Sequence, residues 1–172
     1  MLASRHRFAR SHHRAVRSST LDGDFLTAAA LTGVITDSHF RERDRMGRLL
    51  AFLARLTNPR DGLIGVDAAR GIGVDQSTAV GIDRGIATRL ADRGANGADL
   101  GGSVYFLRPS IAPTVCERGR PLTFRNVQVQ RLSGAGSFHV KNCTGVTGKT
   151  ASYDLPAEAG VLISSQAGGE IY

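Results

Sequence analysis

The chain has 172 residues, of which 41% are hydrophobic and 22% are charged, and its net charge is +7. This composition suits one domain with a real core and excludes wholesale disorder. No apolar run reaches the roughly 20 residues of a membrane-spanning helix, and the start lacks the apolar stretch of a secretory signal. The two cysteines have neither disulfide-scaffold numbers nor zinc-ligand spacing, so both are expected to be ordinary buried thiols. We expect a cytoplasmic protein that needs no cofactor or metal and has no membrane partner.

The positive charge is concentrated at the beginning of the chain. Residues 1–20 contain five arginines and no acidic residue, whereas the rest of the chain is nearly balanced. This stretch also lacks the regular apolar face of a stable helix, which predicts a basic, disordered tail. Phosphate attraction and an arginine-rich organelle presequence are the alternatives. Because the excess charge lies in the tail, nucleic acid is not the expected partner.

Order is expected from residue 21 onward. Residues 33–36 are a short apolar, β-prone run, and strands are also predicted at 71–75 and 77–82. Turn residues near 58–62 end the segment between the first two of these predicted strands. That segment, residues 40–56, is predicted to be a helix because apolar side chains recur in it at helical spacing: Phe40, Met46, Leu49, Leu50 and Leu53.

From about residue 103 the sequence favours strands and turns. The predicted strands are 103–107, 122–132 and 160–164, and the glycine-rich segments 94–102 and 133–148 are predicted to be surface loops. Strand, helix and strand followed by a mostly β portion indicates an α/β protein. It contains one convincing strand-to-helix unit, whereas a doubly wound sheet has several, so the chain looks like part of such a fold.

The densest group of chemical side chains follows the first predicted strand. His39 stands at the carboxyl end of that strand, where open α/β sheets place ligand crevices, and an imidazole can carry a proton near neutral pH. Guanidinium groups nearby suit a carboxylate. On a regular helix Arg43 points away from Arg45, so they converge with Arg48 only if Arg43 precedes the helix. The alternative is a structural histidine beside a solvated charged face.

The segment GVITDSHFRERDRMGRLLAFLA resembles the Asp-Gln-His-Phe-x-x-Arg-x-Arg-x-x-Arg-Leu segment of cyanophycinase and the α-aspartyl dipeptidases, a family of serine exopeptidases. The resemblance continues through residues 71–79, residues 121–133 and Gly-x-Leu-x-Ser at 160–164. It covers residues 25–172, which correspond to the C-terminal half of a typical member. It implies the C-terminal portion of a three-layer flavodoxin-like fold, of the class I glutamine amidotransferase type, with residues 21–172 as a partial peptidase domain.

The resemblance also implies roles for individual residues. Family members hydrolyse β-aspartyl-arginine polymer or related aspartyl peptides, so the implied partner is a peptide with an aspartyl group. Ser38 replaces the glutamine of cyanophycinases, and Gln76 stands where glutamate is common, which removes a possible counter-charge for an arginine side chain. His39 aligns with the catalytic histidine that activates the nucleophilic serine. The residues that align with the substrate pocket are Asp37, Ser38, Arg43, Arg45 and Arg48.

The nucleophile that such a peptidase needs is missing from the sequence. It should stand on a sharp strand-to-helix elbow between glycines, and the chain contains no Gly-x-Ser-x-Gly. One hypothesis is therefore a truncated serine exopeptidase, inactive alone, whose serine lies upstream. The other is a non-catalytic remnant or binding domain for acidic peptides. An incomplete sheet would expose apolar faces and strand edges, which favours a homodimer or aggregation.

Overall fold

The computed structural model describes residues 6–7, 28–60 and 62–172. The basic tail predicted over residues 1–20 lies outside these ranges except for β1 (His6–Arg7), which pairs with β10 (Val161–Leu162). β10 pairs in turn with β9 (Ala157–Glu158), and these three short strands form a small antiparallel sheet. Two 3₁₀ turns flank the body of the fold, η1 (Ala29–Leu31) and η2 (Ala167–Gly169).

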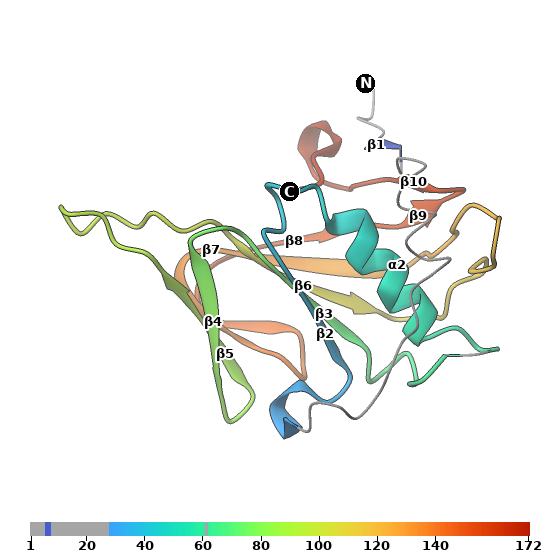
Figure 1. The fold of residues 1–172 in the computed structure, drawn as a ribbon, viewed down its shortest axis with the longest axis horizontal. Helices are drawn as coiled ribbons and strands as arrows, with labels where there is room; N and C mark the ends of the chain where they lie inside the picture. The colour runs from blue at the N-terminus through green and yellow to red at the C-terminus, as the bar shows by residue number, and fades with distance from the viewer. Residues whose placement is uncertain (1–5, 8–27, 61) are drawn as a thin grey trace.

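A seven-stranded mixed sheet forms the body of the molecule (Figure 1). Its strands lie in the order β2-β3-β6-β7-β5-β4, and β8 pairs with the other side of β7. Among the described strands, β2 and β3 pair in parallel and the other neighbours in this sheet pair antiparallel. The protein is therefore a mixed α/β protein with many strands and few helices. The strands are β2 (Val34–Ser38), β3 (Arg70–Val74), β4 (Thr78–Asp83), β5 (Ile86–Ala91), β6 (Val104–Pro109), β7 (Val127–His139) and β8 (Thr144–Asp154).

Helix α2 (Met46–Leu56) joins β2 to β3 and packs on one face of the sheet (Figure 1). The apolar spacing that predicts it is confirmed, because Met46, Leu49, Leu50 and Leu53 are fully buried. The prediction that the helix begins at residue 40 is wrong. His39 and Asp44 have φ values of 48° and 47°, in the left-handed region, so residues 39–45 form a turn instead of a helix. No helix in the described part of the chain combines the length and apolar composition that crossing a membrane requires.

The two faces of the sheet bury separate clusters of side chains. Strand residues alternate between the faces, so Tyr105 and Leu107 of β6 pack on the side of α2. Phe106 packs on the opposite side, where its ring stacks on Phe138 with 3.8 Å between ring centroids. Cys143 belongs to this second cluster, and its burial raises the pKa of its thiol. It is therefore a buried thiol of the kind expected, whereas Cys116 is only partly buried.

The predicted loop at residues 133–148 is wrong, because most of this segment belongs to β7 and β8. Gly134 and Gly148 have φ values of 80° and 85°, and the pairing shifts register between residues 133 and 138. A Cβ on Gly136 would lie 2.5 Å from the Thr147 carbonyl oxygen. These glycines therefore permit irregular pairing of two long strands. β7 begins at Val127, later than the strand predicted at 122–132. β5 was not predicted. Residues 94–102 contain no named strand, as expected for a loop.

Candidate active site

The candidate site lies at the carboxyl ends of β2 and β3. Because these strands are parallel, their ends meet at one edge of the sheet, where α/β proteins commonly bind ligands. Asp37 and Ser38 end β2, His39 follows, and Asp75 follows β3. The Phe40 N–H donates to the Val74 carbonyl at 3.1 Å and ties the segment after β2 to the end of β3.

His39 opens a tightly folded turn. The Arg43 N–H donates to the His39 carbonyl at 3.2 Å, and the Arg45 N–H donates to the Phe40 carbonyl at 2.9 Å. A left-handed conformation costs a non-glycine residue roughly 1–2 kcal/mol, and such strained residues concentrate at functional sites. The His39 side chain is exposed, and its imidazole makes no hydrogen bond with another described residue. The turn therefore holds an imidazole in contact with solvent at the sheet edge.

Asp37 forms ion pairs with two of the predicted pocket arginines. Arg45 Nη1 donates to Asp37 Oδ1 at 2.9 Å and to the Ser38 carbonyl at 2.8 Å. Arg48 Nε donates to Asp37 Oδ2 at 2.8 Å, and its Nη2 contacts Oδ1. The Asp37 side chain is 8% exposed, whereas those of Arg45 and Arg48 are 17% and 33% exposed. Two guanidinium groups thus share one carboxylate, which leaves one unit of positive charge and unassigned N–H donors at the site.

The other predicted pocket residues do not join this cluster through their side chains. Arg43 precedes α2, as convergence requires, but its side chain is exposed and the ion pairs of Asp37 are with Arg45 and Arg48. Ser38 contributes its backbone carbonyl. The structure therefore brings together Asp37, Arg45 and Arg48 with the Ser38 backbone, and leaves Arg43 outside.

Asp75 is a buried acid that sequence reasoning did not single out as a site residue. Its side chain accepts hydrogen bonds from the Arg41 N–H at 3.0 Å and the Ser103 N–H at 2.8 Å. Burial raises the pKa of this carboxyl, although these two bonds oppose the shift. A Cβ on Gly102 would clash with the Asp75 side chain, so the close approach requires glycine. The signal in the sequence was an acid directly after a buried strand.

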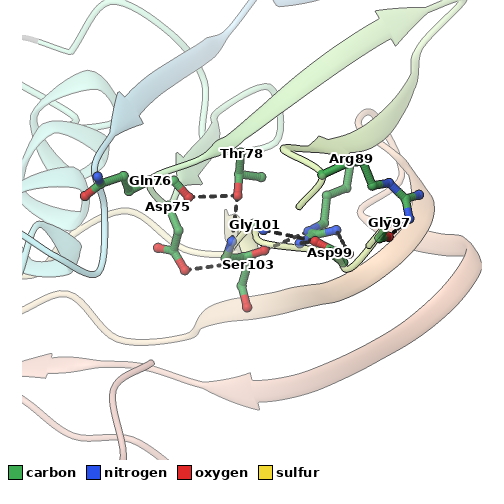
Figure 2. A network of polar contacts seen from close by, with 10 residues as sticks. Asp75, Gln76, Thr78, Arg89, Gly97, Asp99, Gly101 and Ser103 are labelled. Carbon is green, nitrogen blue, oxygen red and sulfur yellow. Dashed lines mark hydrogen bonds and ion pairs between the residues drawn. The ribbon is translucent and has the colours of Figure 1, made fainter. Parts of the chain in front are cut away.

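A network of polar contacts supports the backbone around Asp75 (Figure 2). The Thr78 hydroxyl donates to the Gln76 carbonyl at 3.1 Å and accepts from the Gly102 N–H at 2.8 Å. Arg89 Nε donates to the Gly102 carbonyl at 2.7 Å, and its two Nη atoms bind both oxygens of Asp99 at 2.7 and 2.9 Å. The exposed Gln76 side chain points away from Ser103 (Figure 2). This network fixes loop 94–102 against the end of β3.

Tyr172 holds the His39 turn from the other end of the sequence. Its hydroxyl accepts from the Met46 N–H at 3.0 Å and donates to Asp44 Oδ1 at 2.9 Å. Its ring centroid lies 5.9 Å from that of Phe40 and 5.8 Å from that of Tyr105. Burial raises the pKa of the Tyr172 hydroxyl above its ordinary value. Phe40 in turn packs over Gly73, where a Cβ would lie 2.5 Å from its ring.

The serines closest in pattern to a nucleophile are not presented on an elbow. The Ser103 N–H donates to Asp75, and Ser103 immediately precedes β6. The Ser137 hydroxyl shares a 2.8 Å hydrogen bond with the Thr147 hydroxyl across β7 and β8. Among the residues that the structure describes, no three histidine, cysteine or acidic side chains gather where they could hold a metal ion. Comparison with known protein families and with curated proteins finds no match for the chain. A proposal about function therefore depends on this geometry and on the resemblance of the motifs.

Proposed function

We propose that this chain carries the histidine and the acidic-peptide pocket of a cyanophycinase-like serine exopeptidase, without a nucleophile of its own. The observation that supports this most is the pairing of Asp37 with both Arg45 and Arg48 beside His39. The cluster keeps a positive charge at the carboxyl ends of two parallel strands, where a substrate would enter.

The chemistry of the cluster suits the carboxylate of an aspartyl group. Asp37 occupies Nη1 of Arg45 and both Nε and Nη2 of Arg48, so the remaining guanidinium N–H groups are available to a second carboxylate. Guanidinium forks bind carboxylates through paired, charge-assisted hydrogen bonds. A peptide that ends in an aspartyl residue would therefore bind with its carboxylate against Arg45 and Arg48.

His39 would act as the general base in this proposal. Its imidazole would take the proton of a serine hydroxyl supplied from outside this sequence and return it to the leaving amine. The β2–α2–β3 unit supports a flavodoxin-like fold, because it has two parallel strands joined by a helix. In such a fold, further parallel strands or a second copy would pair with the outer edge of β2. A cytoplasmic location belongs to the same proposal.

A binding domain without catalysis is the second candidate. It is favoured by the His39 imidazole, which makes no hydrogen bond with any described serine. The two candidates differ in how they treat peptide ends. An exopeptidase pocket accepts an aspartyl residue only at a free end, whereas a binding domain also accepts one inside a chain.

Calorimetric titration with β-aspartyl-arginine tests the proposal, with amine release measured on the same samples. We expect saturable binding without release, because the sequence contains no Gly-x-Ser-x-Gly elbow to present a nucleophile. Arg48→Gln should weaken binding about tenfold, since it removes a charge-assisted contact. Arg84→Gln is the matched control, because its side chain is 91% exposed on the β4–β5 hairpin.

Three outcomes decide between the readings. Absence of binding by a folded protein would overturn the proposal. Equal binding of a longer aspartyl peptide blocked at both ends would favour the binding domain. Amine release that disappears in His39→Ala would show instead that the chain contains its own nucleophile, and Ser103→Ala and Ser137→Ala would then locate it.

A further inference from the structure

A second site is suggested by a cavity of about 650 Å³ at the opposite edge of the sheet. Arg108 of β6, Gln128 of β7 and Asp154 of β8 contribute to its lining. Alternation along these strands places the three side chains on the face opposite α2, because their neighbours Leu107, Val129 and Tyr153 belong to the cluster on the α2 side. Leu107 pairs with Gly71 near the start of β3, whereas the candidate active site lies beyond its end. The cavity thus lies at the other end of the strands from that site.

A backbone hydrogen bond and an ion pair hold the wall of this cavity in place. The Ser110 N–H donates to the Asn126 carbonyl at 3.1 Å, and Asn126 has a left-handed φ of 52°. Arg125 Nε and Nη2 bind the two carboxylate oxygens of Glu158 at 2.6 and 2.9 Å. This pair raises the pKa of Arg125 and lowers that of Glu158, so both stay charged and satisfy each other.

The two other charged residues of the lining have no such partner. Arg108 pairs in register with Gln128, and Gln128 pairs with Asp154. Two strand spacings therefore separate Arg108 from Asp154, which is roughly 10 Å. This is the distance between the two backbone positions, and within residues 28–60 and 62–172 neither side chain forms an ion pair. The cavity therefore has one unpaired cation and one unpaired anion, with an exposed amide between them.

We propose that this cavity binds a short zwitterionic peptide, with its carboxylate on Arg108 and its ammonium group on Asp154. An extended peptide of three residues spans about 10 Å, which is comparable with the separation of the two backbone positions that carry these side chains. The amide of Gln128 can both donate to and accept from the peptide backbone between them. A volume of about 650 Å³ lies within the range of small-ligand pockets. This inference does not depend on the proposed peptidase function.

Titration of the intact chain with triglycine, followed by the NMR shifts of its backbone amides, tests this site. Saturable shifts are expected around residues 108, 128 and 154. Arg108→Gln and Asp154→Asn should each weaken binding about fivefold, as expected for loss of one exposed ion pair. Both side chains are exposed, so the variants should fold, and unchanged spectra away from the cavity verify this. Arg84→Gln again serves as the charge-matched control.

The blocked forms of the peptide supply the second arm of the test. N-acetyl-triglycine should lose the contribution of Asp154, and triglycine amide should lose that of Arg108. The proposal is overturned if triglycine gives no saturable shifts, if the blocked peptides bind as well as triglycine, or if the shifts cluster at residues 37–48.

Discussion

Two clusters of arginine and aspartate stand near the same edge of the sheet, and they differ in stoichiometry. In the first, Arg45 and Arg48 share Asp37 and remain 17% and 33% exposed. In the second, the Arg89 side chain is 2% exposed, and all three of its nitrogens donate hydrogen bonds to Asp99 or the Gly102 carbonyl. The second cluster is complete and can only support the fold. The first has an excess positive charge and guanidinium N–H donors without an assigned acceptor, which is what a binding site for an anion needs.

The largest expected effect is on the stability of the complete cluster. Arg89→Ala should lower the free energy of unfolding by about 3 kcal/mol, because it empties a buried position and removes a charged pair. Arg48→Ala should cost less than about 1 kcal/mol, since Arg45 still pairs with Asp37. Urea unfolding of both variants measures the difference. Similar losses in the two variants would mean that the first cluster is equally structural.

A smaller effect is expected where the Tyr172 hydroxyl holds the turn that carries His39. Tyr172→Phe should cost about 1.5 kcal/mol, because the Met46 N–H and Asp44 lose a common partner while the ring contacts remain. Tyr105→Phe is the matched control. The Tyr105 hydroxyl is buried and has no hydrogen-bond partner of good geometry among the described residues, although the Ser103 side chain is near, so its removal should cost less than that of the Tyr172 hydroxyl. Thermal unfolding compares the two, and an equal loss would contradict this account of the turn.

The strained backbone at His39 predicts a difference of about 1 kcal/mol between two substitutions. Glycine adopts a positive φ without steric cost, so His39→Gly should be more stable than His39→Ala by this amount. Both remove the imidazole, so any peptide binding should change equally in the two variants. A His39→Ala variant as stable as His39→Gly would show that the turn relaxes when the imidazole is absent.

The smallest effect is a pH dependence within the complete cluster. The hydrogen bonds that Asp99 accepts from Arg89 lower the pKa of this carboxyl from 3.8 to about 2. Because the folded state holds this carboxyl ionised, its stabilising contribution is present above pH 3.8 and is lost as the pH falls through about 2. The stability difference between the natural protein and Asp99→Asn should therefore shrink over this range. A difference that stays constant down to pH 2 would contradict the assignment.

Local patterns in the sequence were sufficient for β2, α2 and β3. The apolar residues of α2 repeat at helical spacing and are buried. The motif resemblance grouped Asp37 with Arg45 and Arg48, whose side chains the structure brings together. The start of the helix was wrong because a left-handed backbone at His39 and Asp44 is set by contacts that spacing does not show.

Contacts between distant residues account for most of what the sequence did not predict. The glycines of β7 and β8 are typical of loops, but pairing between the two strands overrides that local preference. Asp75 and Arg41 are separated by 34 positions, and Met46 and Tyr172 by 126. The support of the candidate site is therefore tertiary, whereas Asp37, Arg45 and Arg48 lie within one short segment.

The contact with Tyr172 has a consequence for the order in which the molecule matures during synthesis. Residues 39–46 leave the ribosome early, yet the hydroxyl that joins Asp44 to the Met46 N–H is added 126 positions after Met46. Until then the turn lacks its clamp, and Phe40 lacks one of its aromatic neighbours. Nascent chains that lack Tyr172 should therefore hold the turn at His39 less tightly than the 172-residue chain does.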